Sequence, residues 1–125
     1  GKAAEIALRD MKKNKERIQK LDELLLQGIV NIDGIHTTVE ASKRVAGIIN
    51  LVVDKADFHN ERFIKKISNE VALSTGSACS AGEPSYVIQA LGLRDKVTKV
   101  LRVSINKYTT EKDINEFLKV LKSEI

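Results

Sequence analysis

The sequence predicts an α+β fold, in which a small mixed or antiparallel sheet is packed against helices that include a long N-terminal helix and a C-terminal helix. Three observations predict it: helical spacing of apolar residues near the N-terminus, two internal segments rich in β-branched residues, and helical spacing again near the C-terminus. The chain has 125 residues, 42% of them apolar, so it can close one hydrophobic core but is too short for two. We therefore expect a single domain over residues 1–125.

The first predicted element is a long amphipathic helix, because residues 2–27 contain neither proline nor glycine. Its apolar stripe consists of Ile6, Leu8, Met11, Ile18, Leu21, Leu24 and Leu25. Gly28 stands where such a helix would end. Lys15 interrupts the stripe, so we expect the first half of the helix to pack on less surface than the second, or on surface outside this chain.

The next segment gives mixed signals. Residues 29–32 include three β-branched side chains that suit a short strand, whereas residues 31–34 contain turn formers. Val45–Val53 is rich in β-branched residues, which predicts a strand buried on both faces.

A second helix is predicted beyond Asp57, ending at Asn69 and Glu70, and a short strand over Val71–Leu73 follows it. The apolar stripe of this helix consists of Phe58, Phe63, Ile64 and Ile67.

Ser74–Gly82 is a run of nine small residues, which cannot form a dense core and therefore predicts a loop. Pro84 suits the first position of a further helix, and Gly92 suits its C-terminal cap. Val100–Ile105 is rich in β-branched residues and predicts another strand.

The last predicted element is a helix that begins with a capping box at Thr110 and Asp113, with Asp in place of the usual Glu. Its apolar face consists of Ile114, Phe117, Leu118 and Leu121.

Composition excludes several classes of protein. One cysteine cannot form an internal disulfide, and no apolar run approaches the ~20 residues that cross a bilayer. The N-terminus lacks the pattern of a signal peptide. The net charge of +4 is modest, and the densest basic stretch, Lys12–Lys20, contains a glutamate and no aromatic residue. We therefore expect a cytoplasmic protein without direct contact to nucleic acid or membrane.

Cys79 is the strongest candidate for a functional residue. A free cysteine is usually a small buried hydrophobe, but this one lies in a segment of small residues that can be exposed and can move. The predicted helix start at Pro84 would favour an anion nearby, and the thiolate is the nucleophilic form of cysteine. The sequence therefore favours a nucleophilic cysteine.

Other candidates give weaker signals. His36 and His59 are distant from Cys79 in sequence and are interpreted as ordinary surface or core residues, and no spacing of ligands predicts a metal site. Arg102 lies inside an apolar strand, where a charge must be paired or reach solvent. It is either a structural arginine, salt-bridged or with its charged end extended into solvent, or a clamp for a carboxylate or phosphate.

Two segments carry a resemblance to a known family. Ala72–Gly92 reads ALSTGSACSAGEPSYVIQALG and resembles the cysteine loop of NifS/IscS-like cysteine desulfurases, which runs close to S-[ST]-G-S-A-C-[ST]-S and then E-P-S-x-V-L-x-A-L-G. Leu101–Ile114 is similar to that family's I-R-F-S-L-G-R-F-T-T-E-E-E-I, and Arg44–Asn50 more weakly resembles R-x-P-x-T-x-N. The family has the class V aminotransferase fold.

The resemblance implies that residues 1–125 are the C-terminal small domain of a pyridoxal-phosphate enzyme whose large domain is absent from this chain. It implies that Cys79 takes the sulfur of L-cysteine as a persulfide, leaving L-alanine, and that Arg102 binds the substrate carboxylate. The lysine that holds pyridoxal phosphate would lie outside this chain, so the chain alone is expected to be inactive. The full-length protein would be a homodimer.

The destination of the sulfur stays open between iron–sulfur cluster assembly, tRNA thiolation and DNA phosphorothioation, each through an acceptor protein. Two alternatives to a desulfurase also stay open. One is a selenocysteine lyase or another class V aminotransferase-like enzyme in which Cys79 does not accept sulfur. The other is a stand-alone persulfide carrier or protein-binding module.

Overall fold

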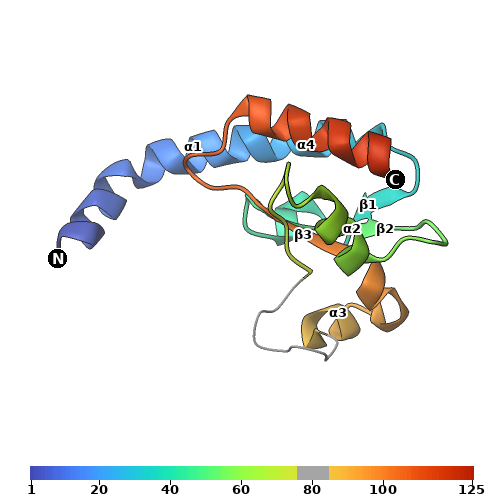
Figure 1. The fold of residues 1–125 in the computed structure, drawn as a ribbon. Helices are drawn as coiled ribbons and strands as arrows, with labels where there is room; N and C mark the ends of the chain where they lie inside the picture. The colour runs from blue at the N-terminus through green and yellow to red at the C-terminus, as the bar shows by residue number, and fades with distance from the viewer. Residues whose placement is uncertain (76–84) are drawn as a thin grey trace.

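A three-stranded antiparallel sheet organises the structure, a computed structural model that describes residues 1–75 and 85–125. The strand order is β1-β2-β3, so that β2 pairs with both of its neighbours (Figure 1). The elements, in chain order, are α1 (Lys2–Val30), β1 (Ile35–Thr37), η1 (Ala41–Lys43), β2 (Ile48–Val53), α2 (Asn60–Ile67), α3 (Tyr86–Ala90), η2 (Arg94–Lys99), β3 (Val100–Ser104) and α4 (Glu111–Glu124). The predicted α+β class is confirmed, and the described sheet is antiparallel throughout.

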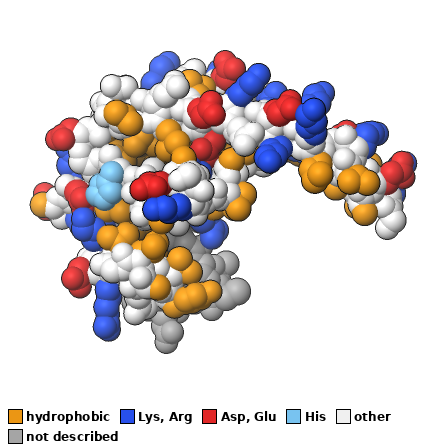
Figure 2. Space-filling model, turned by 180° about the vertical axis from the view of Figure 1, so that it is seen from behind, with side chains coloured by type: hydrophobic (Ala, Val, Ile, Leu, Met, Phe, Trp, Pro, Cys, Tyr) orange, Lys and Arg blue, Asp and Glu red, His pale blue; other side chains and the backbone are white. Residues whose placement is uncertain are grey.

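The two long helices lie side by side on one face of the sheet, and the first half of α1 projects beyond it (Figure 1). The buried residues of α1 all come from its second half, starting at Leu21. In the first half, Leu8 is 73% exposed and Met11 is 61% exposed, and hydrophobic side chains are visible on the projecting arm (Figure 2). The expectation that this half packs on less surface is confirmed.

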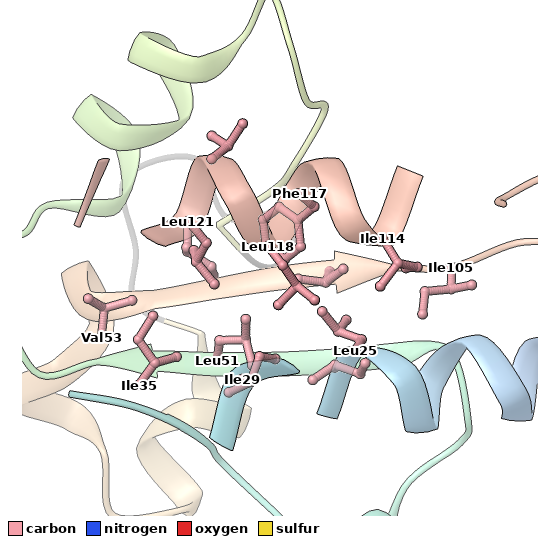
Figure 3. Close-up of a cluster of buried hydrophobic side chains, with 14 of the residues drawn as sticks. Leu25, Ile29, Ile35, Leu51, Val53, Ile105, Ile114, Phe117, Leu118 and Leu121 are labelled. Carbon is pink, nitrogen blue, oxygen red and sulfur yellow. The ribbon is translucent and has the colours of Figure 1, made fainter. Parts of the chain in front are cut away.

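Alternation along the strands divides the sheet into two faces. The face under α1 and α4 carries Ile49, Leu51 and Val53 of β2 with Leu101 and Val103 of β3, all buried. These residues pack with apolar side chains of the helices in one core (Figure 3). The helical members of that core are Leu21, Leu25, Ile29, Phe63, Ile67, Ile114, Phe117, Leu118, Val120 and Leu121.

The opposite face is covered only in part. Val52 and Val100 are buried there against Ile88 of α3, with Leu93 and Val97 packed beside them. Residues 51–53 of β2 therefore have apolar cover on both sides, whereas Asn50 is only partly buried and Ile48 is exposed, so the predicted burial on both faces is confirmed only for this end of the strand. The strand begins at Ile48 rather than Val45, and both of these residues are exposed.

A buried ion pair joins α1 to the turn before β2. The Arg44 guanidinium donates to both carboxylate oxygens of Asp22 at 2.7 Å, and the Gly47 amide donates to Asp22 Oδ1 at 2.7 Å. The two side chains are only 8% and 7% exposed. Gly47 has a φ of +86°, and a Cβ there would lie 2.6 Å from Ile18 Cγ2. The turn therefore requires glycine, and the carboxylate of Asp22 organises it.

The prediction that α1 ends at Gly28 is wrong, because the helix continues to Val30. A Cβ on Gly28 would lie 2.2 Å from Leu118 Cδ1, so this glycine allows α1 and α4 to approach each other. Because the helix continues to Val30, residues 29–32 do not form the predicted strand. Ile29 packs in the core from the helix.

Two further boundaries differ from the prediction. Phe58 lies before α2, which begins at Asn60 and ends at Ile67. Val71–Leu73 forms no strand. The pairing of this part of the chain with the edge of β3 is limited to a single bridge between Ser74 and Arg102. The predicted loop over Ser74–Gly82 and the predicted helix start at Pro84 fall mostly outside the described residues.

Two predicted helix boundaries are confirmed, the C-terminal one at Gly92 and the N-terminal one at Thr110. Gly92 follows α3 with a φ of +74°, which satisfies a glycine C-cap. At the start of α4, Thr110 Oγ1 accepts from the Asp113 amide at 3.2 Å, and Asp113 Oδ2 accepts from the Thr110 amide at 2.8 Å. All four residues of the predicted apolar face of α4 are buried.

Asp22→Ala is expected to lower the free energy of unfolding by about 3 kcal/mol, because it leaves the buried Arg44 cation without its partner. Urea denaturation of the purified protein measures this change. Glu23→Ala is the matched control, since Glu23 is the next residue of α1 and is exposed. It should change stability by less than about 0.5 kcal/mol. Equal effects of the two substitutions would contradict the assigned role of the ion pair.

Gly28→Ala is expected to destabilise the protein by about 1–2 kcal/mol, although alanine is the better helix former, because its Cβ overlaps Leu118. In a Leu118→Ala background the same substitution should become neutral or stabilising, because the overlap is gone. Denaturation of the two single variants and the double variant forms the test. Simple additivity would show that Leu118 is not the cause.

Candidate functional site

Arg102 lies in the middle of β3 and is paired on both sides. It is opposite Asn50 of β2 in the ladder, and on its other side it forms the bridge with Ser74. The Arg102 amide donates to the Ser74 carbonyl at 2.7 Å, and the Ser74 amide donates to the Arg102 carbonyl at 3.4 Å. The segment that ends at Thr75 is thus attached to the outer edge of β3 at Arg102.

The side chain of Arg102 is also bonded to Ser74. Its Nε donates to Ser74 Oγ at 3.0 Å, and both residues are partly buried. Within residues 1–75 and 85–125, neither Nη atom of Arg102 has a hydrogen-bond or ion-pair partner. Among these residues the alternative of a salt-bridged structural arginine therefore has no carboxylate to support it.

The register places Arg102 on the partly covered face of the sheet. Val100 lies two positions before Arg102 and Val52 two positions after Asn50, so all four residues share this face. Val52 and Val100 are covered by Ile88, whereas Asn50 and Arg102 lie beside that cover. Asn50, Arg102 and Ser74 thus form a polar row across the sheet, next to α3.

Cys79 lies in the segment 76–84, outside the described residues. The described chain on either side of that segment reaches this part of the sheet: Ser74 bonds to the edge of β3, and Ile88 packs on Val52 and Val100. We call residues 76–84 the cysteine segment. The candidate site consists of the polar row and the described residues that flank this segment and contact the sheet, Ser74 before it and Ile88 after it. The sequence analysis singled out Arg102 as a candidate but assigned no role to Asn50 or Ser74, because their places beside Arg102 depend on strand register.

The two histidines are separate from the polar row. His36 is exposed on β1, two strands from Arg102, with its Nδ1 3.6 Å from Asp54 Oδ2. His59 precedes α2, and its Nδ1 is buried without a partner among the described residues. No group of three His, Cys, Asp or Glu in the described part of the chain is arranged to hold a metal ion.

A pocket of about 440 Å³ lies elsewhere, where α2 meets the end of α4. It is lined by Phe58, His59, Arg62, Lys66 and Glu124 among others, and Lys66 pairs with Glu124. None of the three residues of the polar row lines it. The pocket therefore does not belong to the candidate site.

Asp54 is a charged residue that directly follows β2, at the end of that strand away from Ile48. Lys96 donates to its two oxygens at 2.8 and 3.0 Å. This hydrogen bond lowers the pKa of the Asp54 carboxyl below its ordinary value, with smaller electrostatic contributions from Lys96, His36 and Lys99. The pair ties the end of β2 to η2, which covers Val100.

The chain's lysines do not form a site for pyridoxal phosphate. Every lysine lies among the described residues, and none is buried. A lysine that forms a Schiff base is activated by desolvation or by a neighbouring cation in a closed pocket. Lys96 and Lys99 are only partly buried and are bonded as cations, to Asp54 and to the carbonyls of Lys55 and Ala56 respectively. The residues present therefore do not fit that cofactor.

Comparison with known proteins identifies clear relatives. The family model described as "Aminotransferase class-V" matches residues 1–117. The chain is 34% identical to the "Cysteine desulfurase IscS" of Shewanella pealeana and 34% identical to that of Acinetobacter baumannii, each over 128 aligned positions. Both alignments cover 100% of this chain and 31% of the relative, so the chain spans about a third of the length of these curated relatives.

Solved structures share the fold. A NifS-like protein from Rickettsia africae matches 92% of this chain and 30% of its own, with a TM-score of 0.78 and 15% identity. Another NifS-like protein matches 98% and 31%, with a TM-score of 0.80 and 21% identity. The cystine C–S lyase C-DES matches 89% and 24%, with a TM-score of 0.62 and 18% identity. None of the helices in the described part of the chain is both long and apolar enough to cross a membrane.

Lys96→Met is expected to raise the pKa of Asp54 towards the ordinary value of about 3.9, because it removes the hydrogen bond that favours the carboxylate. An NMR titration of the carboxyl carbon measures this. Since the folded pKa is depressed, the pair stabilises the protein above the ordinary pKa, and this stabilisation is lost as the pH falls through the folded pKa. Lys43→Met, which removes an exposed cation paired with Glu40, should leave the titration unchanged.

Proposed function

The chain belongs to the class-V aminotransferase family, and from that membership we propose that it is the small domain of a cysteine desulfurase. The observation that supports this most directly is the pairing of Ser74 with Arg102. It attaches the start of the cysteine segment to an arginine that has both Nη groups available among the described residues. The residue five positions before the nucleophile would then lie directly against the anchor for the substrate.

Arg102 is proposed to bind the carboxylate of L-cysteine. A guanidinium presents its donors in a planar fork that matches the two oxygens of a carboxylate. Partial burial strengthens such a bond relative to water, because the local dielectric is lower. The neighbouring Asn50 offers an amide on the same face, which suits a polar substrate.

Cys79 is proposed to be the sulfur acceptor. It follows Ser74 by five positions, so covalent geometry keeps the two Cα atoms within about 18 Å of each other. In the reaction the Cys79 thiolate forms a bond to the substrate sulfur while the substrate C–S bond breaks. The substrate carbon gains a proton and leaves as L-alanine, and Cys79 holds the sulfur as a persulfide.

Pyridoxal phosphate is proposed to be bound by sequence outside these 125 residues. The lack of any buried lysine in the chain supports this, as does the length of the relatives, of which the chain covers 31%. The projecting half of α1, with Leu8 and Met11 exposed, is proposed to pack against that further part of the protein. The isolated chain is accordingly expected to release no alanine from cysteine.

The remaining features of the proposal concern partners. We expect a homodimer of the full-length protein in the cytoplasm, with L-cysteine as substrate and a protein as sulfur acceptor. The acceptor would serve iron–sulfur cluster assembly, tRNA thiolation or DNA phosphorothioation.

A second candidate follows from the fold shared with C-DES, which is described as a cystine C–S lyase. A lyase, including a selenocysteine lyase, would use Arg102 in the same way but would not need Cys79 to accept sulfur. A stand-alone persulfide carrier would need Cys79 but neither Arg102 nor the cofactor. The role of Cys79 in turnover therefore separates the candidates.

Cys79→Ala in the full-length protein is expected to abolish the release of L-alanine from L-cysteine, because the sulfur has no acceptor. Alanine is quantified after incubation with cysteine, and mass spectrometry of the unsubstituted protein locates the added sulfur atom. Ser77→Ala, in the same segment, is the matched control and should retain both activity and the sulfur adduct.

Alanine release that survives Cys79→Ala would favour a lyase. A sulfur adduct on Cys79 that forms only when a separate desulfurase is supplied would favour a carrier. No activity and no adduct under either condition would refute both sulfur-transfer proposals.

A further inference from the structure

We propose that Ser74 is a positioning residue that orients the Arg102 guanidinium for end-on binding of the substrate carboxylate. This rests on the proposed function and assigns a role to a residue that does not touch the substrate. The role follows from which of the arginine's donors Ser74 occupies.

Ser74 is hydrogen-bonded to Arg102 through both its backbone and its side chain. The two backbone hydrogen bonds, at 2.7 and 3.4 Å, fix the Cα atoms of the two residues opposite each other. The third hydrogen bond, from Arg102 Nε to Ser74 Oγ at 3.0 Å, restrains the orientation of the guanidinium. An arginine side chain has large rotamer freedom, and this contact restricts it before any ligand binds.

Occupation of Nε selects the binding mode. A carboxylate can bind a guanidinium side-on, through Nε and one Nη, or end-on, through both Nη atoms. With Nε donating to Ser74, the side-on mode loses one of its two donors. The end-on pair keeps both, and neither Nη has a partner among the described residues. The carboxylate is thus received by Nη1 and Nη2.

Serine suits this role because its hydroxyl can accept from Nε without carrying charge. An acidic residue at position 74 would form an ion pair with Arg102 and compete with the substrate carboxylate. Alanine would leave Nε without an acceptor and the guanidinium free to rotate. Threonine would keep the hydroxyl on the same backbone bridge.

Ser74 also links the anchor to the nucleophile. The residue that orients Arg102 is the residue whose backbone attaches the start of the cysteine segment to β3. The position of the carboxylate is therefore set relative to the same strand edge from which Cys79 is tethered.

The test compares Ser74→Ala, Ser74→Thr and the control Ser104→Ala in the full-length protein. Ser104 is exposed on β3 two positions from Arg102 and has the same orientation on the sheet. Ser74→Ala should raise KM for L-cysteine about tenfold with kcat changed less than about twofold, the loss expected for one hydrogen bond to a charged group. Ser74→Thr should restore KM to within about threefold, and Ser104→Ala should leave it unchanged.

Two further measurements do not depend on turnover. The NMR signal of the Arg102 Nε–H should exchange with solvent faster in Ser74→Ala than in the unsubstituted protein. Affinity for L-alanine, which carries the carboxylate but no sulfur, should fall about tenfold, whereas affinity for cysteamine, which lacks the carboxylate, should not change.

These outcomes separate the two proposals. Unchanged Nε–H exchange, unchanged L-alanine affinity, or an equal loss for L-alanine and cysteamine would overturn the role of Ser74. An unsubstituted protein that releases no alanine from cysteine, but whose L-alanine affinity depends on Ser74, would refute the desulfurase and support the positioning role.

Discussion

The buried carboxylate of Asp22 is the interaction on which the arrangement of helix and sheet depends. It accepts three hydrogen bonds, two from Arg44 and one from the Gly47 amide, and so joins α1 to the turn that begins β2. Because both charges are withdrawn from water, neither can remain buried without the other. The position of β2 relative to α1 follows, and with it the position of β3, which pairs with β2 along its length. The position of the polar row that contains Arg102 therefore depends on the Asp22–Arg44 ion pair.

The two faces of the sheet differ in how completely apolar side chains cover them. The face under α1 and α4 is packed with aliphatic and aromatic side chains and holds the fold together. The other face is closed at one end by α3 and η2, and the polar row lies beyond that cover. A charged residue in the middle of an apolar strand is compatible with this division, because alternation directs Arg102 away from the main core while Leu101 and Val103 enter it.

Predictions from the sequence held where the signal is local and failed where two distant segments meet. The capping box at Thr110 and the glycine cap at Gly92 need only neighbouring residues, and both are present in the structure. The prediction at Gly28 is wrong because a glycine after a leucine cluster locally indicates a helix end. In the structure Gly28 instead makes room for Leu118 of α4, ninety positions later in the chain. The β-branched residues at 29–32 were misread for a related reason, since packing of Ile29 in the core overrides its preference for strands.

The sequence by itself determined the fold class, the two long helices, the central strands, and the two residues singled out for chemistry, Cys79 and Arg102. These depend on periodicity and on motifs that are contiguous in the chain. Only the tertiary structure decided that Ser74 occupies Nε of Arg102, that Asn50 lies opposite it, and that Asp22 is paired with Arg44. The reason is physical: register and burial bring together residues separated by more than twenty positions, and no local pattern specifies such a contact.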